Sequence, residues 1–154
     1  LHTAYSFHLL NATKPTPDLF RAAIGAWCDA DGWPSWSLGN HDVPRFSSRL
    51  AGDDPRLTRT LLALLMCLPG TPFLYQGEEL GLPQARVPRA ALRDPFAIAG
   101  WTEQVQDAGR DGARTPMPWT VAEPDAWLPV DTRHRALSVE TQERDPGSIL
   151  HFTR

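Results

Sequence analysis

The 154-residue sequence has few cysteines, no long apolar run and no block of like charge, and each absence excludes a class of protein. The longest apolar run, Leu61 to Leu68, spans eight residues, which is too short to cross a bilayer. The formal net charge is −3 without a charge cluster, so nothing suggests nucleic-acid binding or a polybasic membrane contact. The two cysteines, Cys28 and Cys67, lie in apolar helical patterns and are expected to be small buried side chains rather than a disulfide or metal ligands.

Proline and tryptophan are abundant instead, with 15 and six copies. They concentrate outside the expected helices, which indicates long ordered loops with aromatic content. The length is that of one ordinary domain, whereas a complete TIM barrel needs roughly 250 residues. The chain starts at Leu1 within an expected strand and stops at Arg154 within an apolar run, so we expect a segment of a longer protein. No signal peptide is visible, but that absence means little for a segment of a longer protein. A cytoplasmic location is expected.

Strands and helices are expected to alternate along the first half of the chain. Both helices start at a capping residue followed by proline, at Thr16-Pro17 and at Asp54-Pro55. The first shows apolar residues at three- and four-residue intervals, and the second is apolar on most sides. This order is typical of a parallel sheet with covering helices. The expected strands span 1–10, 33–38 and 71–76, and the second helix runs over 57–68.

The rest of the chain divides into an aperiodic stretch and a helical tail. From Gly81 to about Thr132 no periodicity is visible and seven prolines occur, in a stretch far longer than the usual loop of about 4–6 residues. Three tryptophans in this stretch favour an ordered loop over a disordered one. The tail from Arg135 to Arg154 regains helical character, with a split into two helices expected at Asp145-Pro146.

Polar side chains follow two of the expected strands where each strand ends, in Asn40-His41-Asp42 and in Gly77-Glu78-Glu79. Because the carboxyl ends of parallel strands meet at one face, where barrel enzymes keep their catalytic groups, we expect both sets on that face. A fixed anion such as Asp42 can stabilise a cationic, oxocarbenium-like sugar, and His41 can donate to a sugar hydroxyl. The same residues also fit an ordinary turn and, for the glutamates, helix capping or pairing with an arginine.

Two arginines, Arg110 and Arg114, flank an acid in the long loop, in the string from Gly109 to Trp119. They could form an ion-pair knot that pins the loop, or they could reach sugar hydroxyls, because a guanidinium offers several planar donors. Arg45, three residues after Asp42, is expected to pair with a carboxylate. For Trp119, packing and stacking on a sugar both stay open.

Together these strings resemble signatures of glycoside hydrolase family 13, the α-amylase superfamily. The string from Ser37 to Asp42 looks like one of its signatures, and Gly70 to Gly81 is similar to the segment on its eighth strand. Arg110 to Trp119 resembles a string of the α-glucosidase and oligo-1,6-glucosidase branch. The resemblance implies an α/β fold, namely a partial TIM (β/α)8 barrel in which 1–154 is a C-terminal fragment of the catalytic domain with a long loop at about 81–132. The implied sixth, seventh and eighth strands are 1–10, 33–42 and 71–79.

The resemblance also implies roles for individual residues. Asp42 matches the transition-state-stabilising aspartate, and His41 matches the adjacent substrate-binding histidine. Arg110 and Arg114 match arginine positions of the loop string, and at least one of them, with Arg114 favoured, is expected to contact the innermost sugar. The family's nucleophilic aspartate and acid/base glutamate belong to its fourth and fifth strands, which this chain does not hold.

The implied parent is a retaining α-glucosidase that removes terminal α-linked glucose from oligosaccharides or disaccharides, while the fragment alone is expected to be inactive. No cofactor, metal, nucleic acid or membrane partner is expected. One alternative is a transglycosylase or isomerase of the same family, such as a sucrose isomerase or a trehalose synthase. Another is a non-catalytic barrel, like the ectodomains of amino-acid transporter heavy chains. Linkage specificity, oligomeric state and secretion of the parent stay open.

Overall fold

The computed structural model describes residues 3–28, 32–102, 104–105, 109–122 and 131–153. In chain order the elements are β1 (Thr3–Tyr5), α1 (Pro17–Cys28), β2 (Trp33–Ser37), α2 (Phe46–Arg49), α3 (Pro55–Cys67), β3 (Thr71–Phe73), the 3-10 turn η1 (Arg89–Ala91), α4 (Pro95–Gly100), the 3-10 turn η2 (Asp111–Ala113), α5 (Thr132–Ala136), α6 (Val139–Glu143) and α7 (Ile149–Phe152). The alternation of strands and helices expected for the first half is confirmed.

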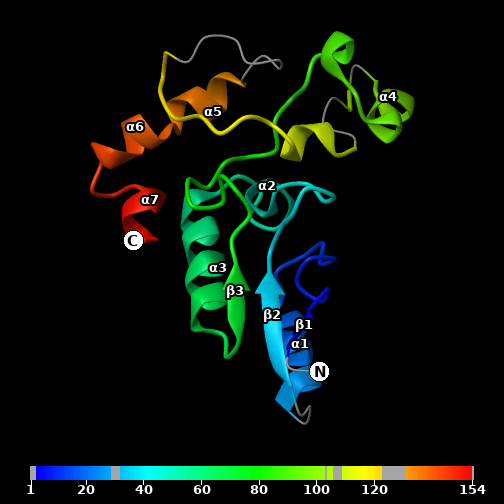
Figure 1. The fold of residues 1–154 in the computed structure, drawn as a ribbon, viewed down its shortest axis with the longest axis vertical. Helices are drawn as coiled ribbons and strands as arrows, with labels where there is room; N and C mark the ends of the chain where they lie inside the picture. Colours follow the sequence, from blue (N-terminus) through cyan, green and yellow to red (C-terminus); the bar gives the residue numbers. More distant parts are fainter. Residues whose placement is uncertain (1–2, 29–31, 103, 106–108, 123–130, 154) are drawn as a thin grey trace.

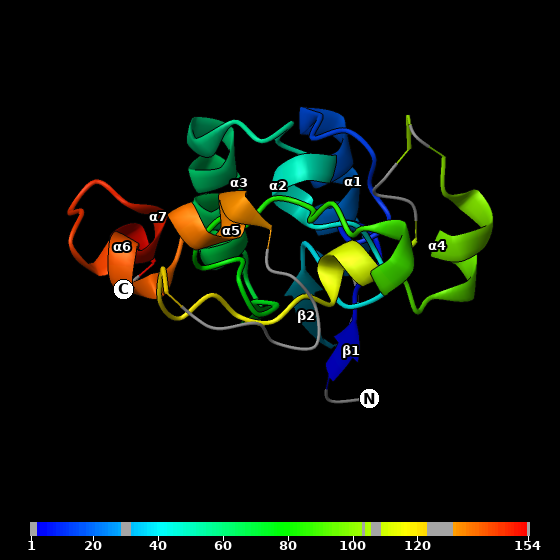
Figure 2. The same ribbon diagram turned by 90° about the horizontal axis from the view of Figure 1, so that it is seen from above.

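The three strands form one parallel sheet in the order β1-β2-β3. Tyr5 pairs with Ser35, and Ser35 pairs in turn with Thr71 on the opposite edge of β2. The crossover helices α1 and α3 lie on the same side of the sheet (Figure 2). All three strands therefore end at the same edge of the sheet, the carboxyl edge, and the long loop after β3 lies beyond that edge (Figure 1).

Local signals set the two long helices where the sequence predicts them. Asp54 caps α3 by accepting from the Arg56 N–H at 2.8 Å, and Pro55 takes the first helical position. At α1 the Thr16 hydroxyl accepts from the Leu19 N–H at 3.3 Å. Both helices therefore begin at the expected residue.

The main core lies between the sheet and these helices. Trp36 of β2 is fully buried, and its indole N–H donates to the Pro69 carbonyl at 2.8 Å. Buried Leu61, Leu62 and Leu65 are the contribution of α3 to this core. Burial of each such leucine contributes roughly 1.5–3 kcal/mol. A smaller core of Leu80, Leu82 and Leu150 joins the segment after β3 to α7.

Several expectations need correction. The strands are shorter than expected, since β1 ends at Tyr5 and β3 at Phe73. Leu9 and Leu10 are nevertheless buried, in a turn, because apolar character records burial rather than strand geometry. Cys67 is exposed at the end of α3, not buried, because it lies on the side of the helix away from the core, next to exposed Met66. The side chain of Cys28 lies outside the described residues.

The stretch from 81 to 132 contains the short elements η1, α4 and η2, which the sequence pattern does not predict. The expected split of the tail at Asp145-Pro146 is confirmed, since α6 ends at Glu143 and α7 begins at Ile149. Trp127 lies outside the described residues. Among the described helices, none is long and apolar enough to cross a membrane.

Candidate functional site

The segment that leaves β2 turns its polar residues out at the carboxyl edge of the sheet. The Ser37 hydroxyl donates to the Gly39 carbonyl at 2.6 Å, and the Asn40 side chain accepts from the Asp42 N–H at 2.8 Å. This turn leaves the Asp42 side chain half exposed, with one carboxylate oxygen, Oδ2, 3.3 Å from the His41 Nε2. Asn40 therefore acts as the turn residue that presents the anion.

The two loop arginines converge on the other oxygen of that carboxylate. Arg114 donates through Nη2 to Asp42 Oδ1 at 2.8 Å and through Nε to the His41 carbonyl at 2.8 Å. Arg110 Nη1 lies 3.5 Å from the same Oδ1. The four residues singled out from the sequence, His41, Asp42, Arg110 and Arg114, are thus brought together, although 68 residues or more separate the arginines from the aspartate.

A second aspartate, Asp94, pairs with Arg110 on the side away from Asp42, and the sequence pattern predicts no site role for it. The buried Asp94 carboxylate accepts from Arg110 Nε at 3.1 Å, from Nη2 at 3.0 Å and from the backbone N–H at 2.8 Å. The hydrogen bonds from Arg110 hold the pKa of Asp94 well below its usual range. Asp94 caps α4 ahead of Pro95, the same cap-then-proline signal that marks α3.

Arg45 lies under the site and ties the end of β3 to the loop. Its guanidinium is buried and donates to the Gln76 carbonyl at 2.8 Å, the Ala113 carbonyl at 3.2 Å and the Thr115 hydroxyl at 3.2 Å. Burial lowers the pKa of Arg45. Among the described residues no carboxylate forms an ion pair with Arg45, so the expectation is wrong for this part of the chain; the Gln76 and Ala113 carbonyls and the Thr115 hydroxyl accept from its two Nη atoms instead.

Glu78 and Glu79 follow β3, as expected, but they stand apart from the cluster on Asp42. Glu78 is buried and accepts from the Tyr75 N–H at 2.8 Å, and its burial raises the pKa to about 8. Its other oxygen lies so close to Gly39 that a Cβ there would be only 2.5 Å away. Glu78 thus closes the turn after β3, which is neither the helix cap nor the ion pair with an arginine that the sequence leaves open for the glutamates.

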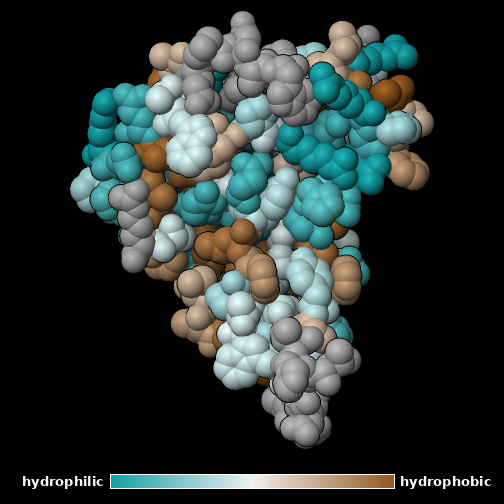
Figure 3. Space-filling view, in the orientation of Figure 1, coloured by the Kyte–Doolittle hydropathy of each residue, from teal (hydrophilic) through white to brown (hydrophobic). Residues whose placement is uncertain are grey.

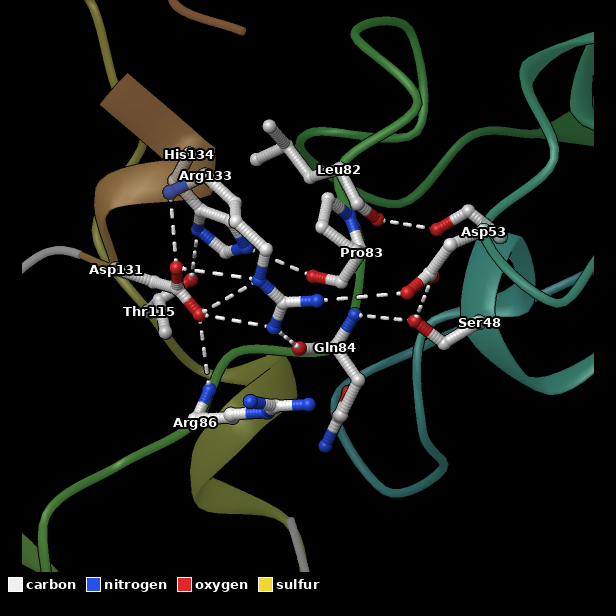
Figure 4. A network of polar contacts seen from close by, with 11 residues as sticks. Ser48, Asp53, Leu82, Pro83, Gln84, Arg86, Thr115, Asp131, Arg133 and His134 are labelled. Carbon is white, nitrogen blue, oxygen red and sulfur yellow. Dashed lines mark hydrogen bonds and ion pairs between the residues drawn. The ribbon is translucent and has the colours of Figure 1, made fainter. Parts of the chain in front are cut away.

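A network of polar contacts joins the start of the long loop to α5, to α2 and to the residues that follow α2 (Figure 4). Arg133 of α5 donates to the Asp131 carboxylate at 2.9 Å and to the Gln84 carbonyl at 2.7 Å. His134 is fully buried between the Pro83 carbonyl, 2.7 Å from Nε2, and the Thr115 hydroxyl, 3.5 Å from Nδ1. Burial lowers the pKa of His134, which favours the neutral ring at neutral pH.

An open hollow of about 390 Å³ lies beside Arg110, lined by Asp42, Pro44, Asp94, Phe96, Gly109 and Arg110. Phe96 is 74% exposed, and the Arg110 guanidinium lies 5.5 Å from the centre of its ring. Hydrophilic residues gather on the upper part of the molecule, over the carboxyl ends of the strands (Figure 3). Trp119, by contrast, is largely exposed and does not line this hollow.

The arrangement suits a ligand that carries both hydroxyl groups and developing positive charge. Asp42 supplies a partly exposed anion, and Arg110, Arg114 and His41 surround it with donors. Within the described residues, no group of three or more histidine, cysteine, aspartate or glutamate side chains could hold a metal ion.

Comparison with known proteins gives consistent matches. The family model for the alpha-amylase catalytic domain matches residues 4–154. A probable alpha-glucosidase of Rhizobium meliloti (strain 1021) is 38% identical, over 100% of this chain and 29% of its own length. An oligo-1,6-glucosidase of Parageobacillus thermoglucosidasius is 33% identical, over 80% of this chain and 26% of its own length.

Solved structures give the same result. The alpha-glucosyl transfer enzyme XgtA is 40% identical with a TM-score of 0.83, and the match covers 96% of this chain and 29% of that one. The trehalulose synthase MutB from Pseudomonas mesoacidophila MX-45 is 26% identical with a TM-score of 0.77, over 99% of this chain and 34% of that one. The chain therefore spans about a third or less of the proteins that it matches.

Proposed function

This chain belongs to the alpha-amylase catalytic-domain family, and on that premise we propose that it is the C-terminal part of the (β/α)8 barrel of a longer, retaining α-glucosidase. β1, β2 and β3 would be the sixth, seventh and eighth strands, and residues 81–132 the long loop after the eighth. The parallel order and the helices on one face support this assignment. Tyr5, Trp33 and Phe73, one on each strand, are 39–54% exposed, as suits a sheet that further strands complete.

The observation that carries the proposal is the convergence of two loop arginines on the carboxylate that follows β2. Glycoside cleavage passes through a cationic, oxocarbenium-like sugar, which a fixed anion stabilises. Asp42, beside Arg114, would stabilise that charge, while His41 and Arg114 bind sugar hydroxyls. The nucleophile and the acid/base would come from strands of the parent outside this chain, so the isolated chain would be inactive. We place the parent in the cytoplasm.

The proposal is tested with Asp42→Asn in the full-length parent. We expect kcat for p-nitrophenyl α-glucoside to fall by several orders of magnitude, because an amide cannot stabilise the cationic sugar. The free energy of unfolding should change little, because the Asp42 side chain is 50% exposed. The matched control is Asp18→Asn, whose side chain is 90% exposed and pairs with Arg21 on α1. Wild-type turnover in Asp42→Asn would remove Asp42 from the mechanism.

A transglycosylase or isomerase is the second candidate, because the solved relatives include an alpha-glucosyl transfer enzyme and a trehalulose synthase. Such enzymes would differ only in the second half-reaction, where a sugar replaces water as the acceptor. Product analysis with sucrose, maltose and isomaltose separates the two: free glucose supports hydrolysis, and rearranged disaccharides support transfer. The cluster of Asp42 with both arginines argues against a non-catalytic barrel.

A further inference from the structure

We propose that Asp94 is a positioning residue, which keeps Arg110 from closing onto Asp42 and thereby leaves the Asp42 anion available to a cationic sugar. This inference rests on the proposed function, because it assigns how the same site is prepared for its substrate. The guanidinium of Arg110 is shared between two carboxylates, those of Asp42 and Asp94.

Arg110 divides its donors unequally. Nε and Nη2 both donate to the Asp94 carboxylate, at 3.1 and 3.0 Å, in a bidentate ion pair. Only Nη1 faces Asp42, and its distance of 3.5 Å is longer than the about 2.7–2.9 Å of a charge-assisted hydrogen bond. Asp94 therefore binds Arg110 more closely than Asp42 does.

Asp94 is itself fixed before any ligand arrives. Its side chain is 0% exposed, and it also accepts from the backbone N–H groups of Arg110 and Phe96. The neighbouring Asp111 accepts from the backbone N–H groups of Arg93 and Asp94 at 2.8 Å each. The position of this carboxylate is thus set by the backbone, not by Arg110 alone.

The backbone before Arg110 is equally constrained. Gly109 has a φ of +75°, and a Cβ there would lie 2.6 Å from the Ala97 backbone nitrogen. The chain consequently enters Arg110 in close contact with α4, and the Phe96 ring lies against its guanidinium. Arg110 lies between α4 and the Asp42 carboxylate, and its pair with Asp94 keeps its guanidinium closer to Asp94 than to Asp42.

The charges give this arrangement a consequence for catalysis. Asp94 compensates the charge of Arg110, so Arg114, at 2.8 Å, is the main cation on Asp42. Without the Asp94 charge, Arg110 would shorten its contact with Asp42 and become a second close counter-ion. A carboxylate paired with two close guanidinium groups stabilises a cationic sugar less well, because its charge is already compensated.

The test is Asp94→Asn in the full-length parent, which keeps the shape and the capping oxygen but removes the charge. We expect kcat to fall about 10- to 100-fold, the effect of one charged hydrogen-bond partner, with a much smaller change in KM. Binding of the cationic iminosugar 1-deoxynojirimycin should weaken by a similar factor, whereas binding of neutral glucose should change far less. Asp131→Asn is the matched control, because Asp131 also caps a helix, α5, and pairs with an arginine, Arg133, but this pair is not part of the cluster around Asp42.

A double-mutant cycle separates positioning from a structural role. In the background of Arg110→Met, adding Asp94→Asn should produce no further loss of kcat, because the group that Asp94 restrains is gone. Equal losses in both backgrounds, an equal loss in Asp131→Asn, or equal weakening of glucose and iminosugar binding would overturn the inference. A wild-type parent that neither turns over glucosides nor binds the iminosugar would overturn the proposed function itself, and the inference with it.

Discussion

Replacement of Arg45 by methionine tests whether the buried hydrogen bonds of Arg45 hold the loop arginines in place beside Asp42. Arg45 is 2% exposed and joins the Gln76 carbonyl, beyond β3, to the Ala113 carbonyl and the Thr115 hydroxyl in the long loop. Methionine keeps most of the length and the apolar stem but removes all the donors. Because Arg114 directly follows Ala113, the loss of this anchor should displace the arginine that contacts Asp42.

The magnitude follows from the contacts. Each hydrogen bond to a charged group is worth about 1.5–3 kcal/mol, but these contributions do not add simply. The Ala113 carbonyl keeps a second donor, the Tyr75 hydroxyl at 3.1 Å, and removal of Arg45 also removes the cost of burying its charge. We therefore expect the free energy of unfolding to fall by about 2–4 kcal/mol. A displacement of about 1 Å at Arg114 should lower kcat/KM by about 100-fold.

Denaturant unfolding and glucoside turnover of the full-length parent measure the two effects. The control is Leu65→Ala in α3, a fully buried core position whose truncation costs about 2–5 kcal/mol without touching the loop. At denaturant concentrations too low to unfold it, Leu65→Ala should retain most of the wild-type kcat/KM. If Arg45→Met retained kcat/KM as well as Leu65→Ala does, Arg45 would hold no part of the site in place.

Two further predictions concern the parent protein. Gly109→Ala should lower kcat/KM, because the φ of +75° at Gly109 and its contact with Ala97 leave no room for a Cβ. The control is Gly25→Ala in α1, where a Cβ would meet nothing within 4 Å; it should raise the free energy of unfolding by up to about 1 kcal/mol and leave turnover unchanged. Turnover assays and unfolding curves on both variants check this, and full activity in Gly109→Ala would contradict it. Because burial raises the pKa of Glu78 from 4.5 to about 8, the folded state binds its proton more tightly, so this contribution to stability is fully present below about pH 4.5 and is lost as the pH rises to about 8, by at most about 1.4 kcal/mol per pH unit. Glu78→Gln should flatten this dependence in unfolding measurements between pH 5 and 8, and an unchanged slope would contradict the assignment.

The sequence predicts those features that depend on neighbouring residues or on topology. The starts of α1 and α3 follow from a capping residue that is directly followed by a proline. The meeting of Asp42 with the loop arginines follows from the resemblance and from the rule that parallel strands end at one face. Neither prediction requires knowledge of side-chain packing.

The features that the sequence does not predict depend on packing between distant segments. Arg45 was expected to pair with a carboxylate, but its acceptors, among them Ala113 and Thr115, lie up to 70 residues away. Asp94 precedes a proline in the sequence, as a helix cap does, but its buried pair with Arg110 forms only when the loop folds back on itself. A charged residue carries no sequence signal for burial, because burial is decided by the partner that compensates it.

The buried contacts that fix the long loop, rather than the ion pairs on Asp42, should determine how precisely the site residues are positioned. The Asp42 pairs with Arg110 and Arg114 involve side chains that are 34–50% exposed, and ion pairs at such sites contribute little to stability. The contacts that fix the loop are instead buried, at Asp94, Arg45 and His134. Because a preorganised site needs its charges held before the substrate arrives, substitutions at these three buried residues should disturb the site more than substitutions at equally distant surface charges.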